Sequence, residues 1–527
     1  MLPEVEIATL NTIGDGLRRA AQRFADKEAV IFQQRRWTYQ QLDQSVNRVA
    51  NYLLQSGLTQ GDRVAAYGKN SDAYLILFLA SARAGMVHVP INFALVQDEL
   101  LYLLKQSGAI AVFMDEDLSD NVAAILSDTS VTISGTLQTQ GRSVTSPDIL
   151  QTALSNADHQ PPAVTVKETD LAQILYTSGT TSHPKGAMHT HRGFMAEYNS
   201  CIQHLYLSSD DRSLCALPLY HSAQMHVFTM PALMIGATSY IMQAPLPQLV
   251  FEAISSEKLN SVFAPPTVWI GLLRDDGFDQ HDLSSLVNIY YGASIMPEPI
   301  VAELQQRLPG CQLFNCYGQS EMAPIATVLA PEEQEGRLAS IGKPVMSVET
   351  RIVDPVTMQD CPVGERGEII HRSPHVMVGY WDKPEQTAEA FSGGWFHSGD
   401  LAYADEEGYL YIVDRIKDVV NTGGVLVASR DVEEALYLHP AVAEVAVIGT
   451  PHERWIEAIT AVIVFKTGED ADSDELVRHC QQHLAPFKVP KSFIFTDSLP
   501  KNTAGKLLKR SLREQYNEAQ LDEALSV

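Results

Sequence analysis

One stretch of the sequence places several hydroxyl groups directly ahead of a lysine. The chain reads LYTSGTTSHPKGAMHTH over residues 175–191, and the hydroxyl-rich part before Lys185 comprises Thr177, Ser178, Gly179, Thr180 and Thr181. Such a segment offers backbone N–H groups, hydroxyl donors and one cation together, which suits an oligophosphate. The Walker phosphate loop is disfavoured, because Pro184 stands where that motif has Gly and Gly186 where it has Ser or Thr. Taken alone, the stretch could also be a plain polar surface loop.

Five further segments carry residue types that could act on a phosphate-bearing ligand. They are PLYHSAQM with His221, YYGASIMP with Gly292, Ala293 and Ser294, NCYGQSEMAP with Tyr317, Gly318, Ser320 and Glu321, WFHSGDLA with Asp400, and PKNTAGKLLKR with Lys506. Each has a purely structural explanation by itself, since a single histidine is commonly a core residue and a single lysine a surface residue. Their order and spacing along the chain therefore matter more than any one of them.

Composition limits the classes of partner. The net charge is −26, from 64 acidic and 38 basic residues, which argues against a nucleic-acid partner or an anionic membrane surface. The six cysteines form no C-x-x-C pair, which predicts reduced thiols, no zinc site and a cytoplasmic protein. The first residues lack a basic and an apolar signal region, and the longest apolar run, from Val227, is too short and too mixed to cross a bilayer. We interpret that run as a core helix leading into a strand.

The elements that must position these residues alternate between short β-branched runs and helical patterns. RVAAYG (63–68) reads as a strand, and Ser71 can cap the helix that follows it. Strands alternating with helices predict an α/β fold, with parallel or mixed sheets covered on both faces. Over residues 345–413 short strands and turns predict a small antiparallel β-subdomain.

A chain of 527 residues is too long for one ordinary core. We predict a large N-terminal domain over residues 1–413, a hinge over 414–418 and a small α+β C-terminal domain over 419–527. In the last of these, SRDVEEALYLHPAV (429–442) reads as a capped helix. Residues 486–510 hold six basic side chains against one acid, which is either a solvated positive face or an anion site.

In this order and spacing the motifs resemble the adenylate-forming superfamily, which comprises acyl-CoA synthetases, adenylation domains of peptide synthetases and firefly-type luciferases. The resemblance covers essentially the whole chain. DRIKDVVNTGGVLVASRDVEEALY (414–437) and the single-chain layout are most similar to bacterial fatty-acyl-CoA synthetases. The resemblance implies an ATP-dependent acid–CoA ligase, which joins a carboxylate to AMP with release of pyrophosphate and then transfers the acyl group to the CoA thiol.

The resemblance also implies roles for the ATP-binding residues. Thr177–Thr181 and Lys185 would hold the β- and γ-phosphates, and Ser320 would touch the α-phosphate. Glu321 would hold Mg²⁺ through oxygen, as a hard cation requires. Gly292, Ala293 and Tyr317 would form an adenine slot, and Ser294 and Gly318 would belong to the same ATP/AMP-binding site. Asp400 would accept both ribose hydroxyls, and Arg415 would reach the ribose or phosphate edge. His221 would orient the substrate carboxylate or gate the pocket.

The C-terminal domain would alternate between two arrangements about a hinge at Lys417. In the first, Lys506 would bridge the attacking carboxylate and the α-phosphate. In the second, Gly423 and Gly424 would line a tunnel for the pantetheine arm, and the basic run that contains Lys488 would serve the CoA phosphates. The expected ligands are thus ATP, Mg²⁺, CoA and a carboxylic acid, and the resemblance leaves a homodimer open.

Two segments depart from the family pattern. Ser182 stands where the phosphate segment usually has Gly, and Val425 with Leu426 follow the glycine pair where polar residues are frequent. The second departure concerns the thiolation half-reaction.

The substrate remains open at this point. The candidate pocket segments hold no obvious basic residue for a second carboxylate, which favours a medium- to long-chain fatty acid. Aryl and short-chain acids are the alternatives. A stand-alone adenylation enzyme that loads a separate carrier protein, a luciferase-type oxidase and a non-catalytic adenylate-binding protein are the other functions considered.

Overall fold

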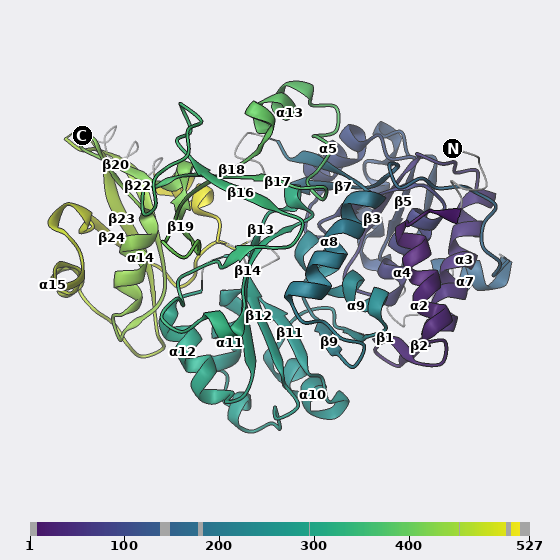
Figure 1. The fold of residues 1–527 in the computed structure, drawn as a ribbon, viewed down its shortest axis with the longest axis horizontal. Coiled ribbons are helices and arrows are strands. Elements are labelled where there is room, and N and C mark those ends of the chain that lie inside the picture. Colours follow the sequence, from purple (N-terminus) through teal and green to yellow (C-terminus); the bar gives the residue numbers. More distant parts are fainter. Residues whose placement is uncertain are drawn as a thin grey trace.

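The computed structural model describes residues 8–137, 148–156, 158–177, 183–294, 296–452, 454–501 and 507–516. Within these residues the strands form two large and two small sheets. Figure 1 shows the N-terminal helices at one end of the molecule and the C-terminal unit, which carries α14 (Ser429–Tyr437) and α15 (Ser473–His483), at the other. The predicted α/β class, with a small separate α+β unit at the C-terminus, is confirmed.

The first large sheet has nine strands, with a parallel centre and antiparallel strands at both edges. In spatial order they are β15 (Lys343–Pro344), β14 (Ile325–Leu329), β13 (Gln312–Gly318), β12 (Asn288–Gly292), β11 (Ser261–Ala264), β9 (Arg212–Cys215), β10 (Thr238–Ile241), β1 (Glu28–Phe32) and β2 (Arg35–Thr38). The carboxyl ends of the adjacent parallel strands β12 and β13 carry the YYGAS and NCYGQSE motifs, so the topology brings these two motifs to one edge.

The second large sheet has six strands and is parallel except for the hairpin β7–β8. In spatial order they are β6 (Ile133–Thr136), β5 (Ala111–Met114), β3 (Arg63–Tyr67), β4 (Val87–Ile91), β7 (Leu171–Thr177) and β8 (Lys185–Thr190). The hydroxyl-rich segment therefore joins two antiparallel strands, whose end residues Thr177 and Lys185 are cross-strand partners.

The helices cover the sheets and fill the space between them. They are α2 (Ile13–Arg23), α3 (Tyr39–Gln55), α4 (Asp72–Arg83), α5 (Gln97–Ser107), α6 (Ser119–Ala123), α7 (Ile149–Asn156), α8 (His191–His204), α9 (Met230–Ile235), α10 (Pro247–Glu257), α11 (Pro266–Arg274), α12 (Glu298–Arg307) and α13 (Pro384–Ala390). Helices α4 and α8 each contact both large sheets. Helix α4 is accordingly apolar around almost its whole circumference, as expected for a helix buried on all sides.

Two smaller sheets follow along the chain. The four antiparallel strands are β16 (Glu349–Val353), β17 (Gly367–Arg372), β18 (Phe396–Ala404) and β19 (Leu410–Arg415), which confirms the predicted β-subdomain. The C-terminal sheet comprises β21 (Val425–Val427), β20 (Val420–Thr422), β23 (Ile456–Phe465) and β22 (Val442–His452), with β24 (Ser492–Phe495) beside β23. A separate apolar cluster packs against this sheet.

Local sequence signals predicted several boundaries correctly. The side chain of Ser71 caps α4 by accepting a hydrogen bond from the Tyr74 amide. The apolar run from Val227 forms the end of a π-helix (Ala223–Thr229), then α9 and β10, so the predicted core helix leading into a strand is confirmed. The π-helical winding was not predicted. In the described part of the chain, no helix is long and apolar enough to cross a membrane.

A buried polar chain links the six-stranded sheet to the helices beneath it. The Nε2 of Gln173 lies 2.9 Å from Nδ1 of His88, and its Oε1 lies 2.7 Å from Nε2 of His226. The hydroxyl of Tyr198 lies 2.8 Å from Nδ1 of His226. All four side chains are buried. Burial lowers the pKa of His88 to about 3, so this ring is neutral in the folded protein.

The low pKa of His88 predicts how stability depends on pH. The unfolded chain takes up a proton at His88 below about pH 6.5, whereas the folded protein does not until about pH 3. The stability that depends on the neutral His88 ring is therefore present above about pH 6.5, and the free energy of unfolding falls as the pH drops below that value. His88→Gln should lower the slope of unfolding free energy against pH between 4.5 and 6 by about 1.4 kcal/mol per pH unit.

Urea unfolding at several pH values measures this slope. His159→Gln, at a half-exposed histidine, is the control. An unchanged slope in His88→Gln would contradict a neutral buried ring.

Candidate active site

Asp400 is the centre of a polar cluster that joins three strands. Its side chain, in β18, is 5% exposed, and its Oδ2 accepts hydrogen bonds from the Tyr317 hydroxyl at 2.7 Å and from Nε2 of Gln319 at 2.8 Å. Nε of Arg415, at the end of β19, lies 2.7 Å from Oδ1 in an ion pair whose angle is not that of a hydrogen bond. The carboxylate thus holds the end of β13 against the β-subdomain.

The electrostatics of the cluster fix its protonation. Burial and the adjacent Asp400 carboxylate raise the pKa of Tyr317 well above its usual value, so its hydroxyl keeps its proton and donates. Burial acts to lower the pKa of Arg415, but the charges of Asp400 and of other acidic groups nearby, among them Asp418 and Glu321, together outweigh it and the pKa rises. A protonated ring hydroxyl and a charged guanidinium therefore both contact the Asp400 carboxyl group.

Gly292 and Gly318, the last residues of β12 and β13, have no room for a Cβ atom. A Cβ added to Gly292 would lie 2.1 Å from the carbonyl oxygen of Cys316, and one added to Gly318 would lie 1.8 Å from that of Pro324. Ala293, which follows Gly292, has a φ of +63° and is exposed. Ser294 is half-buried. The two glycines therefore let backbone segments pack against each other at this edge, beside Tyr317.

A second cluster surrounds Glu321, one turn beyond this edge. Its Oε1 accepts hydrogen bonds from the Thr177 hydroxyl at 3.2 Å and from the Tyr380 hydroxyl at 3.1 Å. Nζ of Lys185 lies 5.1 Å from the centroid of the Tyr380 ring, within cation–π range. A carboxylate, two hydroxyls and a cation therefore meet at the end of the β7–β8 hairpin. Tyr380 was not predicted as a site residue, because it belongs to no recognised motif.

The Glu321 cluster fits a magnesium ion that is shared with a substrate. Mg²⁺ is usually bound in enzymes by one or two carboxylates together with substrate phosphates and water. Glu321 offers a carboxylate and Thr177 a hydroxyl oxygen. Among the residues that the structure describes, no group of three His, Cys, Asp or Glu side chains could hold a metal by itself. A protein-only metal cage is therefore not present in that part of the chain.

Ser320 links the Glu321 cluster to the buried π-helix. The hydroxyl oxygens of Ser222 and Ser320 lie 2.8 Å apart. His221, which precedes Ser222, is half-buried, and its Nδ1 lies 3.5 Å from the Ala223 amide that donates to it. The structure thus brings His221 and Ser320 to one region.

The remaining predicted residues lie in the C-terminal part or outside the described residues. Gly423 and Gly424 have φ values of +68° and +86°, which favour glycine, and the Gly423 amide donates to the Trp455 carbonyl at 2.6 Å. Lys488 forms a 2.5 Å ion pair with Asp431, and Lys417 lies in the short helix Ile416–Asp418 that follows β19. The predicted residues Ser178, Gly179, Thr180, Thr181 and Lys506 lie outside the described residues, as does Ser182. The hinge and the CoA tunnel stay predictions.

The close approach at Gly318 makes a testable prediction. Gly318→Ala places a methyl group against backbone atoms that cannot rotate away, so we expect a loss of stability of about 3 kcal/mol. Gly271→Ala is the matched control, because nothing lies within 4 Å of a Cβ at that position in α11. There the added methyl should stabilise the helix by about 0.5–1 kcal/mol. Urea unfolding measures both, and equal stabilities of the two variants would contradict the predicted collision.

Comparison with known proteins agrees with this geometry. The AMP-binding enzyme family matches residues 17–381, and the AMP-binding enzyme C-terminal domain matches residues 431–506. A feruloyl-CoA synthase of Amycolatopsis is 37% identical over 91% of this chain and 94% of its own length. The long-chain-fatty-acid–CoA ligase FadD13 of Mycobacterium tuberculosis is 33% identical over 92% of this chain and 93% of its own.

A solved structure shares the whole architecture. ATP-bound MatB from Rhodopseudomonas palustris is 30% identical, with a TM-score of 0.88 over 96% of this chain and 99% of that one. Both the sequence matches and this structural match extend over nearly the full chain. The chain therefore belongs to the AMP-binding enzyme family and is a member of the adenylate-forming superfamily, in the acyl-CoA synthetase group of AMP-forming acid–thiol ligases.

Proposed function

We propose that the protein is an ATP-dependent acid–CoA ligase that acts on an apolar monocarboxylic acid. The observation that carries this proposal is that two polar clusters, one around Asp400 and one around Glu321, both include residues at or just after the end of β13. The Asp400 cluster offers acceptors and a ring beside the end of β12, where Ala293 is exposed, and the Glu321 cluster offers a carboxylate, hydroxyls and Lys185. The first suits a nucleoside and the second a magnesium triphosphate.

In the first half-reaction an oxygen of the carboxylate attacks the α-phosphorus of ATP. The bond from that phosphorus to the bridging oxygen breaks, and pyrophosphate leaves. We propose that Asp400 accepts the ribose hydroxyls, that Gly292 and Tyr317 line the adenine, and that Lys185 neutralises the leaving pyrophosphate. Glu321 would hold Mg²⁺, which supplies positive charge to the phosphates when bound. Lys506 would stabilise the charge that builds on the reacting oxygens.

In the second half-reaction the CoA sulfur attacks the acyl carbon. The carbon–sulfur bond forms, the bond to the AMP oxygen breaks, AMP leaves and the thiol proton is released to solvent. We propose that the Gly423–Gly424 segment lines the path of the pantetheine arm after rotation about Lys417. Val425 and Leu426, 45% and 67% exposed, would then bring apolar side chains to that path.

The side chains near Ser320 support an apolar acid. The π-helix that follows His221 buries Met225, Val227 and Phe228, and the Phe228 ring stacks on Phe263 at 4.3 Å. The only ionisable side chain of that π-helix is His226, and both of its ring nitrogens are engaged within the buried polar chain. This helix therefore offers no cation that could bind a second carboxylate of the substrate.

Two classes of acid fit this surrounding. The relatives include a feruloyl-CoA synthase and a long-chain-fatty-acid–CoA ligase, so an aryl acid and a medium- to long-chain fatty acid are both candidates. The six cysteines are all free thiols, which supports a reducing, cytoplasmic setting.

One assay tests the reaction and the acid together. Pyrophosphate release and thioester formation are measured with MgATP and a panel of acetate, octanoate, palmitate, benzoate and ferulate, with and without CoA. We expect acid-dependent pyrophosphate release, and acyl-CoA only when CoA is present. Lys506→Ala should slow adenylation about a hundredfold or more, because it removes preorganised charge from the transition state.

Lys258→Ala is the control, since this exposed lysine pairs with Asp282 away from both clusters. Pyrophosphate release without thioester would instead support an enzyme that loads a carrier protein. If no acid of the panel promotes release, the proposed activity on these acids is wrong.

A further inference from the structure

Helix α5 contacts the chain on both sides of the hydroxyl-rich segment. On the C-terminal side the contact is made by Tyr102. Its ring stacks on the ring of His183, with centroids 4.7 Å apart and planes 20° apart, and its hydroxyl donates to the Pro184 carbonyl at 3.1 Å. His183 and Pro184 directly precede Lys185. Tyr102 thus fixes the backbone from which the Lys185 side chain starts.

On the N-terminal side the contact is made by Gln106. Its Oε1 accepts a hydrogen bond from the hydroxyl of Tyr176, the residue before Thr177. Its Nε2 donates to the Trp381 carbonyl at 2.9 Å, and the Trp381 indole donates back to the Gln106 carbonyl at 3.1 Å. Trp381 directly follows Tyr380. The Gln106 side chain therefore hydrogen-bonds to Tyr176 and to Trp381. These are the sequence neighbours of Thr177 and Tyr380, the two residues that donate to Glu321.

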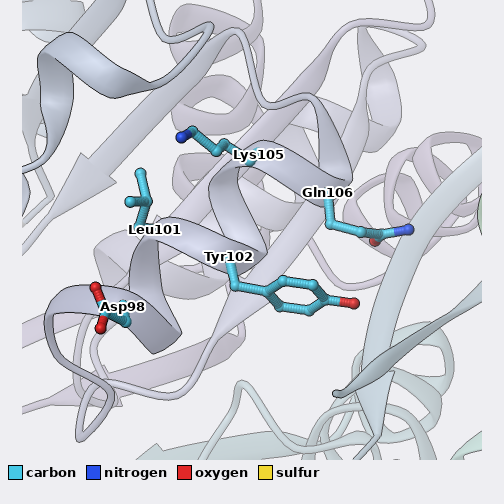
Figure 2. A pocket seen from close by; sticks show the side chains of 5 residues that line it. All are labelled: Asp98, Leu101, Tyr102, Lys105 and Gln106. Carbon is cyan, nitrogen blue, oxygen red and sulfur yellow. The ribbon is translucent and has the colours of Figure 1, made fainter. Parts of the chain in front are cut away.

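The two α5 residues act from one face of the helix. They are four positions apart and so lie one above the other. Figure 2 shows the side chains of Tyr102 and Gln106 extending to the same side of α5, away from those of Leu101 and Lys105. These residues and Asp98 line a hollow of about 380 Å³. Neither Tyr102 nor Gln106 carries a charge, so neither supplies a counter-charge to a phosphate.

We propose that Tyr102 and Gln106 are positioning residues that hold Lys185 and Thr177 where the β- and γ-phosphates of ATP bind. The inference rests on the proposed function, which assigns those phosphates to this hairpin end. It goes further because it assigns the positioning of Lys185 and Thr177 to α5, a helix outside every recognised motif. Because the support acts only at the β- and γ-phosphates, its loss weakens the binding of ATP and leaves the binding of AMP unchanged.

Calorimetric titration with MgATP and with AMP tests the inference without any acid substrate. In Tyr102→Ala the stack and the hydrogen bond are both lost, so the Kd for ATP should rise about tenfold or more while that for AMP stays within about twofold. Tyr102→Phe keeps the stack and loses only the hydrogen bond, so its Kd for ATP should rise about two- to fivefold. Lys105→Ala, on the same helix and lining the same hollow, should bind both nucleotides as the unmodified protein does.

The outcomes separate the inference from the proposed function. If the unmodified protein binds neither nucleotide, the proposed function fails and the inference with it. If it binds both, and Tyr102→Ala either binds ATP normally or loses affinity for ATP and AMP equally, the inference alone is overturned. If Tyr102→Ala does not fold, Tyr102→Phe decides, and an unchanged Kd for ATP in that variant overturns the inference.

Discussion

The rest of the site depends on the hydrogen bonds and the ion pair of the buried Asp400 carboxylate. This carboxylate lies in the β-subdomain, yet its partners Tyr317 and Gln319 lie at and just beyond the end of β13, the last parallel strand of the nine-stranded sheet. The third partner, Arg415, ends the strand that leads toward the C-terminal unit. A buried carboxylate with these partners is stable in only one relative position of the three segments, because each displaced donor would leave buried charge unpaired. The position of the proposed nucleoside site at the ends of β12 and β13 follows from that constraint.

The second constraint is the close packing of backbone at the ends of β12 and β13. Gly292 and Gly318 have no space for a Cβ, so the strands there can approach as nearly as backbone allows. That approach puts Glu321, three residues beyond Gly318, within reach of the Thr177 hydroxyl on the other large sheet. The two sheets are otherwise separated by α4 and α8. Glu321 and Thr177 therefore bridge two layers at the place where the proposed triphosphate would lie.

Much of this could be predicted from the sequence, because the family motifs are contiguous and hold glycines, hydroxyls and charges in a fixed order. Strand and helix alternation likewise predicted both the α/β class and the β-subdomain. The supporting residues could not be predicted. Gln106 and Tyr176 are 70 positions apart and Gln106 and Trp381 are 275 apart, so no local pattern indicates that they meet. Tyr102 and Tyr380 stand in segments that read as ordinary amphipathic or loop sequence.

The junction after β19 shows how the two units adjoin. The capped helix predicted over 429–442 forms as α14 over Ser429–Tyr437, and its N-cap residue, Ala428, makes no side-chain capping bond. The amide and hydroxyl of Ser429 both donate to Asp414, at 2.6 and 2.7 Å. Lys509 in turn pairs with Glu433 at 2.7 Å and donates to the Ser429 hydroxyl.

Of these contacts, the one that crosses the junction joins Ser429 to Asp414 and is polar, while the C-terminal sheet keeps an apolar cluster of its own. Polar groups that separate in this way regain hydrogen bonds from water once the movement exposes them, whereas separating a shared apolar core would leave apolar surface in water. A unit joined in this way can change its position without unfolding, which is the physical requirement for the proposed rotation about Lys417.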